Sequence, residues 1–169
     1  AVFLKIKQAQ KNGDICFAVS YSSAKMIDEK GIVPAIRSAL DRSLKKIEKS
    51  FTQVRPAYVG EPAGSCLAPT YAYANCRVLL DGSLKAPARY VNQKTIIRGD
   101  DSEPVISLAS ICTKVLRDRK MVAFAKKHPQ YGFEIHKGYG TKAHYRAIKK
   151  HGLSPLHRKS FLKGIVPQN

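Results

Sequence analysis

Short β-prone runs alternate with longer helical segments along this chain, and the alternation constrains the fold more than any other feature. Residues 15–19, 77–80 and 95–97 have the branched, aliphatic and aromatic side chains typical of strands. Between the first two runs, apolar side chains recur at spacings of three and four, which predicts an amphipathic helix. These side chains are Val33, Ile36, Leu40, Leu44 and Ile47. Strands that alternate with helices indicate an α/β domain.

Start and stop signals predict three further helical segments. A short helical turn is expected over residues 23–29. A long helix is predicted from about residue 102 to residue 127, with Pro104 in its first turn. A last helix is expected between Thr141, a good N-cap, and Gly152, which commonly follows the end of a helix.

Residues 51–75 differ in composition from the rest of the chain. They contain three Pro and two Gly and have little periodicity, so we interpret them as a loop insertion. The 169 residues have the length of one domain, without internal repeats or a clear linker. We therefore expect residues 1–169 to form a single domain that carries this insertion.

The chain has a large excess of positive charge. Its 30 Lys and Arg against 12 Asp and Glu give a formal net charge of +18. Residues 101–169 hold 14 basic and 4 acidic residues, and the basic side chains are interleaved with apolar helix positions rather than gathered in a tail. Such a field attracts polyanions, so nucleic acid is the expected partner. Charge alone leaves a solvated basic surface, ribosome assembly and general RNA binding open.

Cysteine spacing and the apolar pattern indicate the cellular compartment. Cys16, Cys66, Cys76 and Cys112 lie far apart, without a C-x-x-C pair, which argues against a zinc ribbon. Free buried thiols in a reducing cytosol are favoured over disulfides. No apolar run approaches the roughly 18 residues of a membrane helix, and no signal peptide is visible. We therefore expect a cytoplasmic protein without a membrane partner.

Two carboxylates stand where a hydrolytic site could use them. Asp81 follows the strand predicted at 77–80, and open α/β sheets bind ligands at the carboxyl ends of their strands. A turn-forming Asp before Gly82 is an equal alternative. Asp118 lies among basic residues inside the long predicted helix, where a surface ion pair is the simpler interpretation. Carboxylates from two separate elements suit a pair of Mg²⁺ ions that act on a phosphate.

Five segments between residues 77 and 161 carry recognisable motifs. They read VLLDG at 78–82, IRGD at 97–100, SLASICTKVLRDR at 107–119, YGFEIHKGYGT at 131–141 and SPLHRKSF at 154–161. In this order and at roughly this spacing they resemble successive motifs of the ribonuclease HII family. Five motifs in order are far more specific than any one of them alone.

The resemblance implies an α/β, ribonuclease H-like fold with a mixed sheet flanked by helices and a C-terminal helical region. It also implies a four-carboxylate site that uses Mg²⁺ or Mn²⁺, in which Asp81 matches the third acid and Asp118 the fourth. Tyr139 matches the aromatic residue that packs on the sugar beside the RNA–DNA junction. The implied phosphate contacts are Lys114, Lys137 and Arg158.

Each of these assignments has a plainer alternative. Tyr139 could be a core or loop tyrosine, and the three cations could be solvated surface charges. Asp100 is favoured as a helix-start residue that complements the helix dipole. The histidines form no recognisable metal cluster in the sequence, so they are expected to be structural or to lie near phosphates. They are His128, His136, His144, His151 and His157.

One departure from the family pattern concerns its first motif. The family opens with a strand that carries adjacent Asp and Glu, followed by Gly-Arg-Gly. Residues 1–169 hold no such sequence, and Asp28-Glu29 is no substitute, because Lys and Gly follow it in a predicted helical turn. The first residue is Ala rather than Met. We expect an upstream segment to supply this strand, with two of the four acids and the backbone that reads the 2′-OH.

Two main functional interpretations follow. The first is a monomeric, metal-dependent endoribonuclease that hydrolyses the RNA strand of RNA–DNA hybrids and cuts at ribonucleotides embedded in duplex DNA. The second is a catalytically inactive nucleic-acid-binding remnant or subunit of the same fold, and a ribosomal or assembly protein is a third. An in-frame Asp-Glu-x-Gly-Arg-Gly strand encoded upstream of Ala1 would favour the enzyme.

Overall fold

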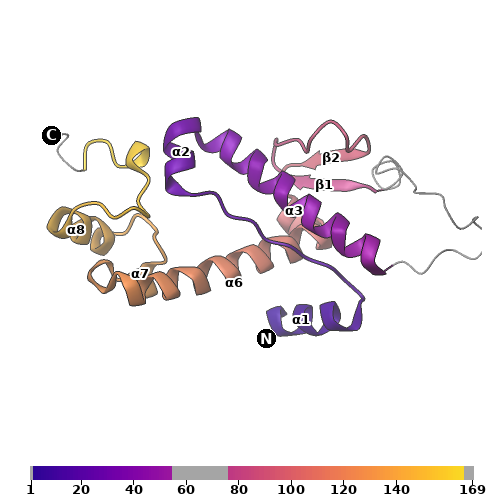
Figure 1. Ribbon diagram of the computed structural model, residues 1–169, viewed down its shortest axis with the longest axis horizontal. Helices are drawn as coiled ribbons and strands as arrows, with labels where there is room; N and C mark the ends of the chain where they lie inside the picture. Colours follow the sequence, from indigo (N-terminus) through magenta and orange to yellow (C-terminus); the bar gives the residue numbers. More distant parts are fainter. Residues whose placement is uncertain (1, 55–75, 166–169) are drawn as a thin grey trace, which may run out of the picture. The chain divides into compact units, whose positions relative to one another are not determined.

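The computed structural model describes residues 2–54 and 76–165, in which helices predominate and a small parallel sheet is present (Figure 1). The predicted α/β class is confirmed. The chain divides into two compact units, and two separate stretches of sequence build each of them. These stretches are Ala1–Ser20 with Arg37–Cys112 in the first unit, and Tyr21–Ile36 with Thr113–Asn169 in the second.

The sheet belongs to the first unit. Its strands, β1 (Val78–Asp81) and β2 (Gln93–Ile96), run parallel, with Asp81 opposite Ile96 at the carboxyl end (Figure 1). Both strands lie within two residues of the bounds predicted from the sequence. Within the described part of the chain, the sheet consists of these two strands.

The core of the first unit lies between the sheet and α3 (Ile32–Val54). Leu40 and Leu44 belong to the apolar stripe predicted from the sequence, and both pack against this core. Burial of this part of the stripe holds the helix on the sheet. Val33 and Ile36 of the same predicted stripe are exposed, so the prediction holds only in part. The buried side chains of the core are Val78, Leu80, Ala86 and Tyr90.

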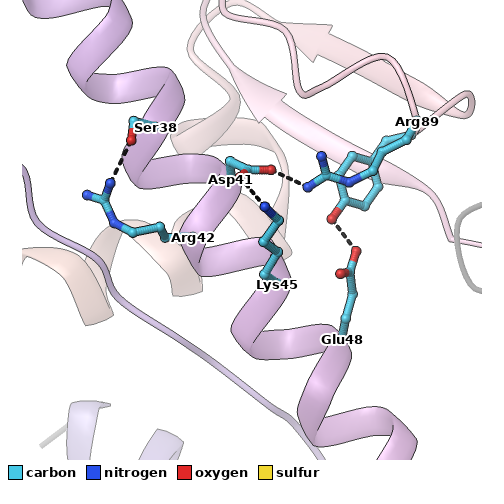
Figure 2. Close-up of polar contacts among 7 residues, drawn as sticks. Ser38, Asp41, Arg42, Lys45, Glu48 and Arg89 are labelled. Atoms are coloured by element: carbon cyan, nitrogen blue, oxygen red, sulfur yellow. Dashed lines mark hydrogen bonds and ion pairs between the residues drawn. The ribbon is translucent and has the colours of Figure 1, made fainter. Parts of the chain in front are cut away.

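Polar contacts tie the connection between the two strands to α3 (Figure 2). Arg89 pairs with Asp41, and the Lys45 ammonium lies 3.0 Å from the same carboxylate. These hydrogen bonds, that from Arg89 first, hold the pKa of Asp41 below its ordinary value. Further along the helix, Glu48 accepts a hydrogen bond from the Tyr90 hydroxyl. The helix thus holds the segment that leads from β1 to β2.

The strand predicted over residues 15–19 is wrong, because this segment is extended but pairs with no strand in the described residues. It follows an N-terminal helix, α1 (Val2–Asn12). Phe17 packs edge-on against Phe3 of that helix, with ring centroids 6.1 Å apart. β-Propensity reflects how well a side chain fits a half-buried surface rather than a backbone preference, and here a helix provides that surface.

The loop predicted over residues 51–75 is wrong in its first part, because α3 continues through Val54. Residues 55–75 lie outside the described part of the chain, and so does Cys66. None of the helices in the described part is both long and apolar enough to cross a membrane. The cysteines in the same part are free thiols. Cys112 is buried as expected, but Cys16 is only partly buried and Cys76 is exposed, so burial was predicted wrongly for these two.

The second unit contains the predicted C-terminal helices. Thr141 is the N-cap of the last one, because its hydroxyl accepts a hydrogen bond from the His144 N–H at 3.2 Å. The segment between α6 and this last helix includes two short helical turns. The elements are α2 (Ala24–Lys30), α6 (Pro104–Lys127) from Thr113 onward, η1 (Pro129–Tyr131), α7 (Phe133–His136), α8 (Lys142–His151) and η2 (Lys159–Phe161).

Aromatic side chains fill the core of the second unit. The rings of Tyr131 and Phe133 stack with centroids 5.4 Å apart, and Ile148 of α8 is fully buried beside them. Ala125 brings α6 into the same cluster. This core holds the segment between α6 and α8, which carries the YGFEIHKGYGT motif.

Asp28 of α2 joins this helix to η2. Its carboxylate accepts hydrogen bonds from the backbone N–H groups of Lys159 and Ser160, both at 2.9 Å, and from the Ser160 hydroxyl at 2.5 Å. These hydrogen bonds, that from the Ser160 hydroxyl first, keep the pKa of Asp28 below its ordinary value. They also fix the backbone next to Arg158.

Candidate metal and nucleic-acid site

Asp81 is the last residue of β1, and its side chain is exposed. Its Oδ1 atom accepts a hydrogen bond of 2.9 Å from the backbone N–H of Gly99, which opens the short helix α5 (Gly99–Ser102). Close packing favours glycine here, because a Cβ atom would lie 2.6 Å from the Ile106 side chain and 3.3 Å from Cβ of Ile96. One carboxylate oxygen is thus held at the strand end, and the group stays open to solvent.

Asp118 lies on α6 and forms an ion pair with its neighbour Arg117. The Nε and Nη2 atoms of Arg117 lie 3.0 and 2.7 Å from Asp118 Oδ1. Both side chains are partly exposed, 41% for Asp118 and 36% for Arg117, so the pair adds little to stability. The surface ion pair that the sequence suggested as the simpler alternative is therefore present, and it uses one of the two carboxylate oxygens.

Arg117 also contacts Tyr139 within the second unit. Its guanidinium carbon lies 4.5 Å from the centroid of the tyrosine ring, which is a cation–π contact. Burial alone would lower the pKa of Arg117, but hydrogen bonds with Asp118 and Tyr139 outweigh it and raise the pKa. One cation thus joins a candidate metal ligand to a candidate sugar-contacting ring. The sequence signals Arg117 only by its position directly before Asp118.

Tyr139 combines an exposed side chain with a fixed backbone. The residue is 56% exposed, so the core alternative is wrong. Its N–H donates to the His136 carbonyl at 2.8 Å, and its own carbonyl accepts from the Thr141 N–H at 2.8 Å and from His144 Nδ1 at 3.0 Å. Gly138 precedes it with φ of +80°, a conformation that glycine adopts without strain. The loop is therefore suited to hold a ring in contact with a ligand.

The three cations expected to contact phosphates also lie in the second unit. Lys114 is exposed on α6. Lys137 is half-buried after α7, and its ammonium donates to the Glu134 carbonyl. Arg158 is exposed, and its guanidinium carbon lies 4.1 Å from the Phe161 ring centroid. Their contacts with phosphates stay a prediction.

The two candidate metal ligands lie in different units of the chain. Asp81 belongs to the first unit and Asp118 to the second, so their convergence on a metal pair stays a prediction. In the residues that the structure describes, no three His, Cys, Asp or Glu side chains gather to hold a metal ion. Carboxylates suit Mg²⁺, which prefers oxygen ligands, so the chemistry of the two groups fits the expected ion. Asp100 lies in the first turn of α5, as favoured from the sequence.

Three histidines form a buried cluster that the sequence does not reveal. His136, His144 and His157 are 8%, 6% and 7% exposed. Their positions follow no helix or metal-ligand spacing, and only the fold of the second unit brings them together. The expectation that these histidines are structural agrees with their burial. His144 also contacts the backbone carbonyl of Tyr139 and the ring of His157.

An α/β fold with one carboxylate at a strand end, another on a helix and exposed cations is typical of metal-dependent nucleases. The family model described as Ribonuclease HII matches residues 68–163 of this sequence. That match covers more than half of the chain. The chain therefore belongs to the ribonuclease HII family, as the five motifs indicate.

Individual relatives agree with this assignment. The Ribonuclease HII of Prochlorococcus marinus is 38% identical over 150 residues, which are 89% of this chain and 66% of the relative. The Ribonuclease HII of Coxiella burnetii is 48% identical over 97 residues, 54% of this chain and 48% of the relative. That of Endomicrobium trichonymphae is 51% identical over 83 residues, 49% of this chain and 40% of the relative. The matched part of the chain thus spans between two fifths and two thirds of these proteins.

Proposed function

We propose that this chain contributes two catalytic carboxylates and the duplex-binding surface of an endoribonuclease. The enzyme hydrolyses the RNA strand of RNA–DNA hybrids and cuts at ribonucleotides embedded in duplex DNA. The observation that carries the proposal is the contact of Arg117 with both Asp118 and Tyr139. This contact supports the proposal, because a group for the reacting phosphate would then lie beside a ring for the neighbouring sugar.

In this mechanism Asp81 and Asp118 would hold Mg²⁺ or Mn²⁺. When bound, these ions stabilise the attacking water and the leaving oxygen of the phosphodiester. Arg117, which pairs with Asp118, would be available to bind a phosphate of the substrate. The Tyr139 ring packs on the sugar, and Lys114, Lys137 and Arg158 bind the flanking phosphates and set the register of the duplex. A cytoplasmic monomer remains our expectation.

Binding to a nucleic-acid duplex should weaken steeply as salt increases. Each neutralised phosphate contributes about −0.9 to the slope of log affinity against log salt, so three contacts predict a slope of about −2.7. Between 50 and 200 mM salt the affinity should fall roughly 40-fold. Lys114→Ala should make the slope shallower by about 0.9, whereas Lys25→Ala, at an exposed position of α2, should leave it unchanged. A slope near zero for the wild-type chain, measured by fluorescence anisotropy, would contradict duplex binding through phosphates.

Tyr139→Ala should reduce the preference for a duplex with one embedded ribonucleotide more than it reduces affinity for plain DNA. Stacked aromatic contacts are worth about 1–3 kcal/mol, so the preference should drop roughly tenfold. Tyr21→Ala is the matched control, because Tyr21 is also exposed and has the Lys120 ammonium 4.0 Å from its ring centroid. Equal losses of Tyr139→Ala on both duplexes would assign Tyr139 a structural role.

The alternative function is binding to nucleic acid without catalysis. The observation that favours it is the formal net charge of +18, because this charge attracts polyanions whether or not the protein cleaves them. An inactive protein would keep the salt dependence described above but show no divalent-ion-dependent cleavage when an Asp-Glu strand is supplied. The cleavage experiment therefore separates the two functions.

A further inference from the structure

The buried histidines of the second unit lie within hydrogen-bonding distance of one another and of the loop that carries Tyr139. The Nε2 atoms of His144 and His157 are 3.1 Å apart. The ring of His136 stacks on that of His144, with centroids 4.3 Å apart. Buried polar groups are costly unless each donor and acceptor is paired. The backbone partners of these rings can only donate or only accept, so they determine which ring nitrogen carries the proton.

The hydrogen bonds assign one tautomer to each ring of the pair. His157 Nδ1 lies 2.9 Å from the backbone N–H of Ser154, which can only donate. His157 Nδ1 therefore accepts, its proton is on Nε2, and it donates to His144 Nε2. His144 must then carry its proton on Nδ1, which donates to the Tyr139 carbonyl at 3.0 Å. A one-way relay runs from Ser154 through both imidazoles to Tyr139.

His136 supports the other side of the same loop. Its Nδ1 atom accepts from the Gly138 N–H at 3.2 Å, so its Nε2 proton donates to the Tyr131 carbonyl at 2.7 Å. The backbone carbonyl of His136 accepts the N–H of Tyr139 at 2.8 Å. Both sides of the Tyr139 peptide are thus held by groups whose proton positions are determined.

We propose that His144 and His157 are positioning residues for the duplex contact of Tyr139. Their relay fixes the Tyr139 carbonyl, and through it the direction in which the exposed ring leaves the surface. The proposal rests on the proposed function in one respect: the ring must be the part that meets the sugar. A buried apolar pair of similar volume would fill the core at lower cost. The paired imidazoles instead specify one conformation of the loop.

Two substitutions of His144 separate the relay from simple packing. In His144→Asn, the side-chain amide nitrogen occupies the place of Nδ1 and can still donate to the Tyr139 carbonyl. In His144→Gln, the amide reaches the place of Nε2 and meets His157, but it leaves the carbonyl without this donor. Both variants replace the ring by a neutral amide, so a packing role predicts similar behaviour for the two.

Nitrogen chemical shifts and amide exchange test the relay without reference to activity. In the full chain, NMR should find the Nδ1–H tautomer at His144 and the Nε2–H tautomer at His157. The net value of a hydrogen bond is about 0.5–1.5 kcal/mol, so the Tyr139 and Thr141 amides should exchange about 2- to 13-fold faster in His144→Gln than in His144→Asn. The opposite tautomers, or equal exchange in the two variants, would overturn the relay.

Duplex binding tests whether the histidine relay positions Tyr139 for its contact with the sugar. Relative to plain DNA, His144→Asn should keep the wild-type preference for a duplex with one embedded ribonucleotide, and His144→Gln should lose most of it at similar melting temperature. If wild-type protein prefers the ribonucleotide and both variants keep that preference, the positioning role is overturned. If wild-type protein shows no preference, the sugar contact in the proposed function fails, and with it the positioning role. The exchange data still decide whether the relay itself exists.

Discussion

A longer protein that joins an Asp-Glu strand to these 169 residues is expected to cleave a duplex with one embedded ribonucleotide in Mg²⁺ or Mn²⁺. The 169-residue chain alone should be slower by at least about 10²-fold. Two carboxylates fix a pair of divalent ions less well than four, and misplacement of a reacting group by about 1 Å already costs that factor. The net charge of +18 also repels cations from an incomplete site.

The experiment compares the chain alone, the extended protein and substituted forms of the extended protein on the same labelled duplex. Asp81→Asn and Asp118→Asn should each abolish most of the cleavage. Asp101→Asn is the matched control, since Asp101 is an exposed carboxylate that pairs with Arg98 in α5. Rapid metal-dependent cleavage by the chain alone, lost in Asp81→Asn, would show that cleavage does not need the acids of an added Asp-Glu strand.

The second unit should lose stability as the pH falls from about 6.5 to about 4. Burial lowers the pKa of His157 from 6.5 to about 4, and burial also lowers the pKa of His144. Between pH 6.5 and 4 these histidines bind protons in the unfolded chain but not in the folded chain. The free energy of unfolding therefore rises with pH in this range. One pKa unit is worth 1.36 kcal/mol, so His157 alone accounts for up to roughly 3 kcal/mol across the window.

Urea unfolding at a series of pH values measures this effect. His157→Gln removes the titrating ring, so its free energy of unfolding should vary less between pH 6.5 and 4 than that of the wild-type chain. After burial, the neighbouring imidazoles of His144, His128 and His136 also lower the pKa of His157, because a second positive charge beside them is unfavourable. His151→Gln is the control, because His151 is exposed on α8 and its removal should leave the acid dependence in place. An unchanged pH dependence in His157→Gln would contradict the assignment.

Features with a local cause could be predicted from the sequence. Thr141 as the N-cap of α8 and Gly152 as the residue directly after this helix were both predicted from residues within one helical turn, and both predictions are confirmed. The apolar stripe of α3 is likewise a matter of spacing along one helix. The strand over residues 15–19 could not be judged in this way, because strand formation needs a partner from another part of the chain.

The candidate site likewise has residues that the sequence predicts and contacts that it does not. The sequence motifs mark Asp81, Asp118 and Tyr139, but they contain no information about the hydrogen bond from Gly99 to Asp81, which joins residues 18 positions apart. The cation–π contact of Arg117 and the pairing of His144 with His157 also depend on packing between elements. Sequence reasoning finds residues by type and spacing, whereas their partners come from the fold.

The contact of Asp28 with η2 has a consequence for biosynthesis. Asp28 and Lys159 are 131 residues apart, and a ribosome that adds about 5–20 residues per second needs roughly 7–26 s to cover that distance. Throughout this interval the carboxylate on α2 has been made but its backbone donors have not. The first unit, whose last residue is Cys112, is complete well before then. The contact between α2 and η2 can form only after Ser160 has been synthesised, and no contiguous gene fragment that starts after α2 reproduces it.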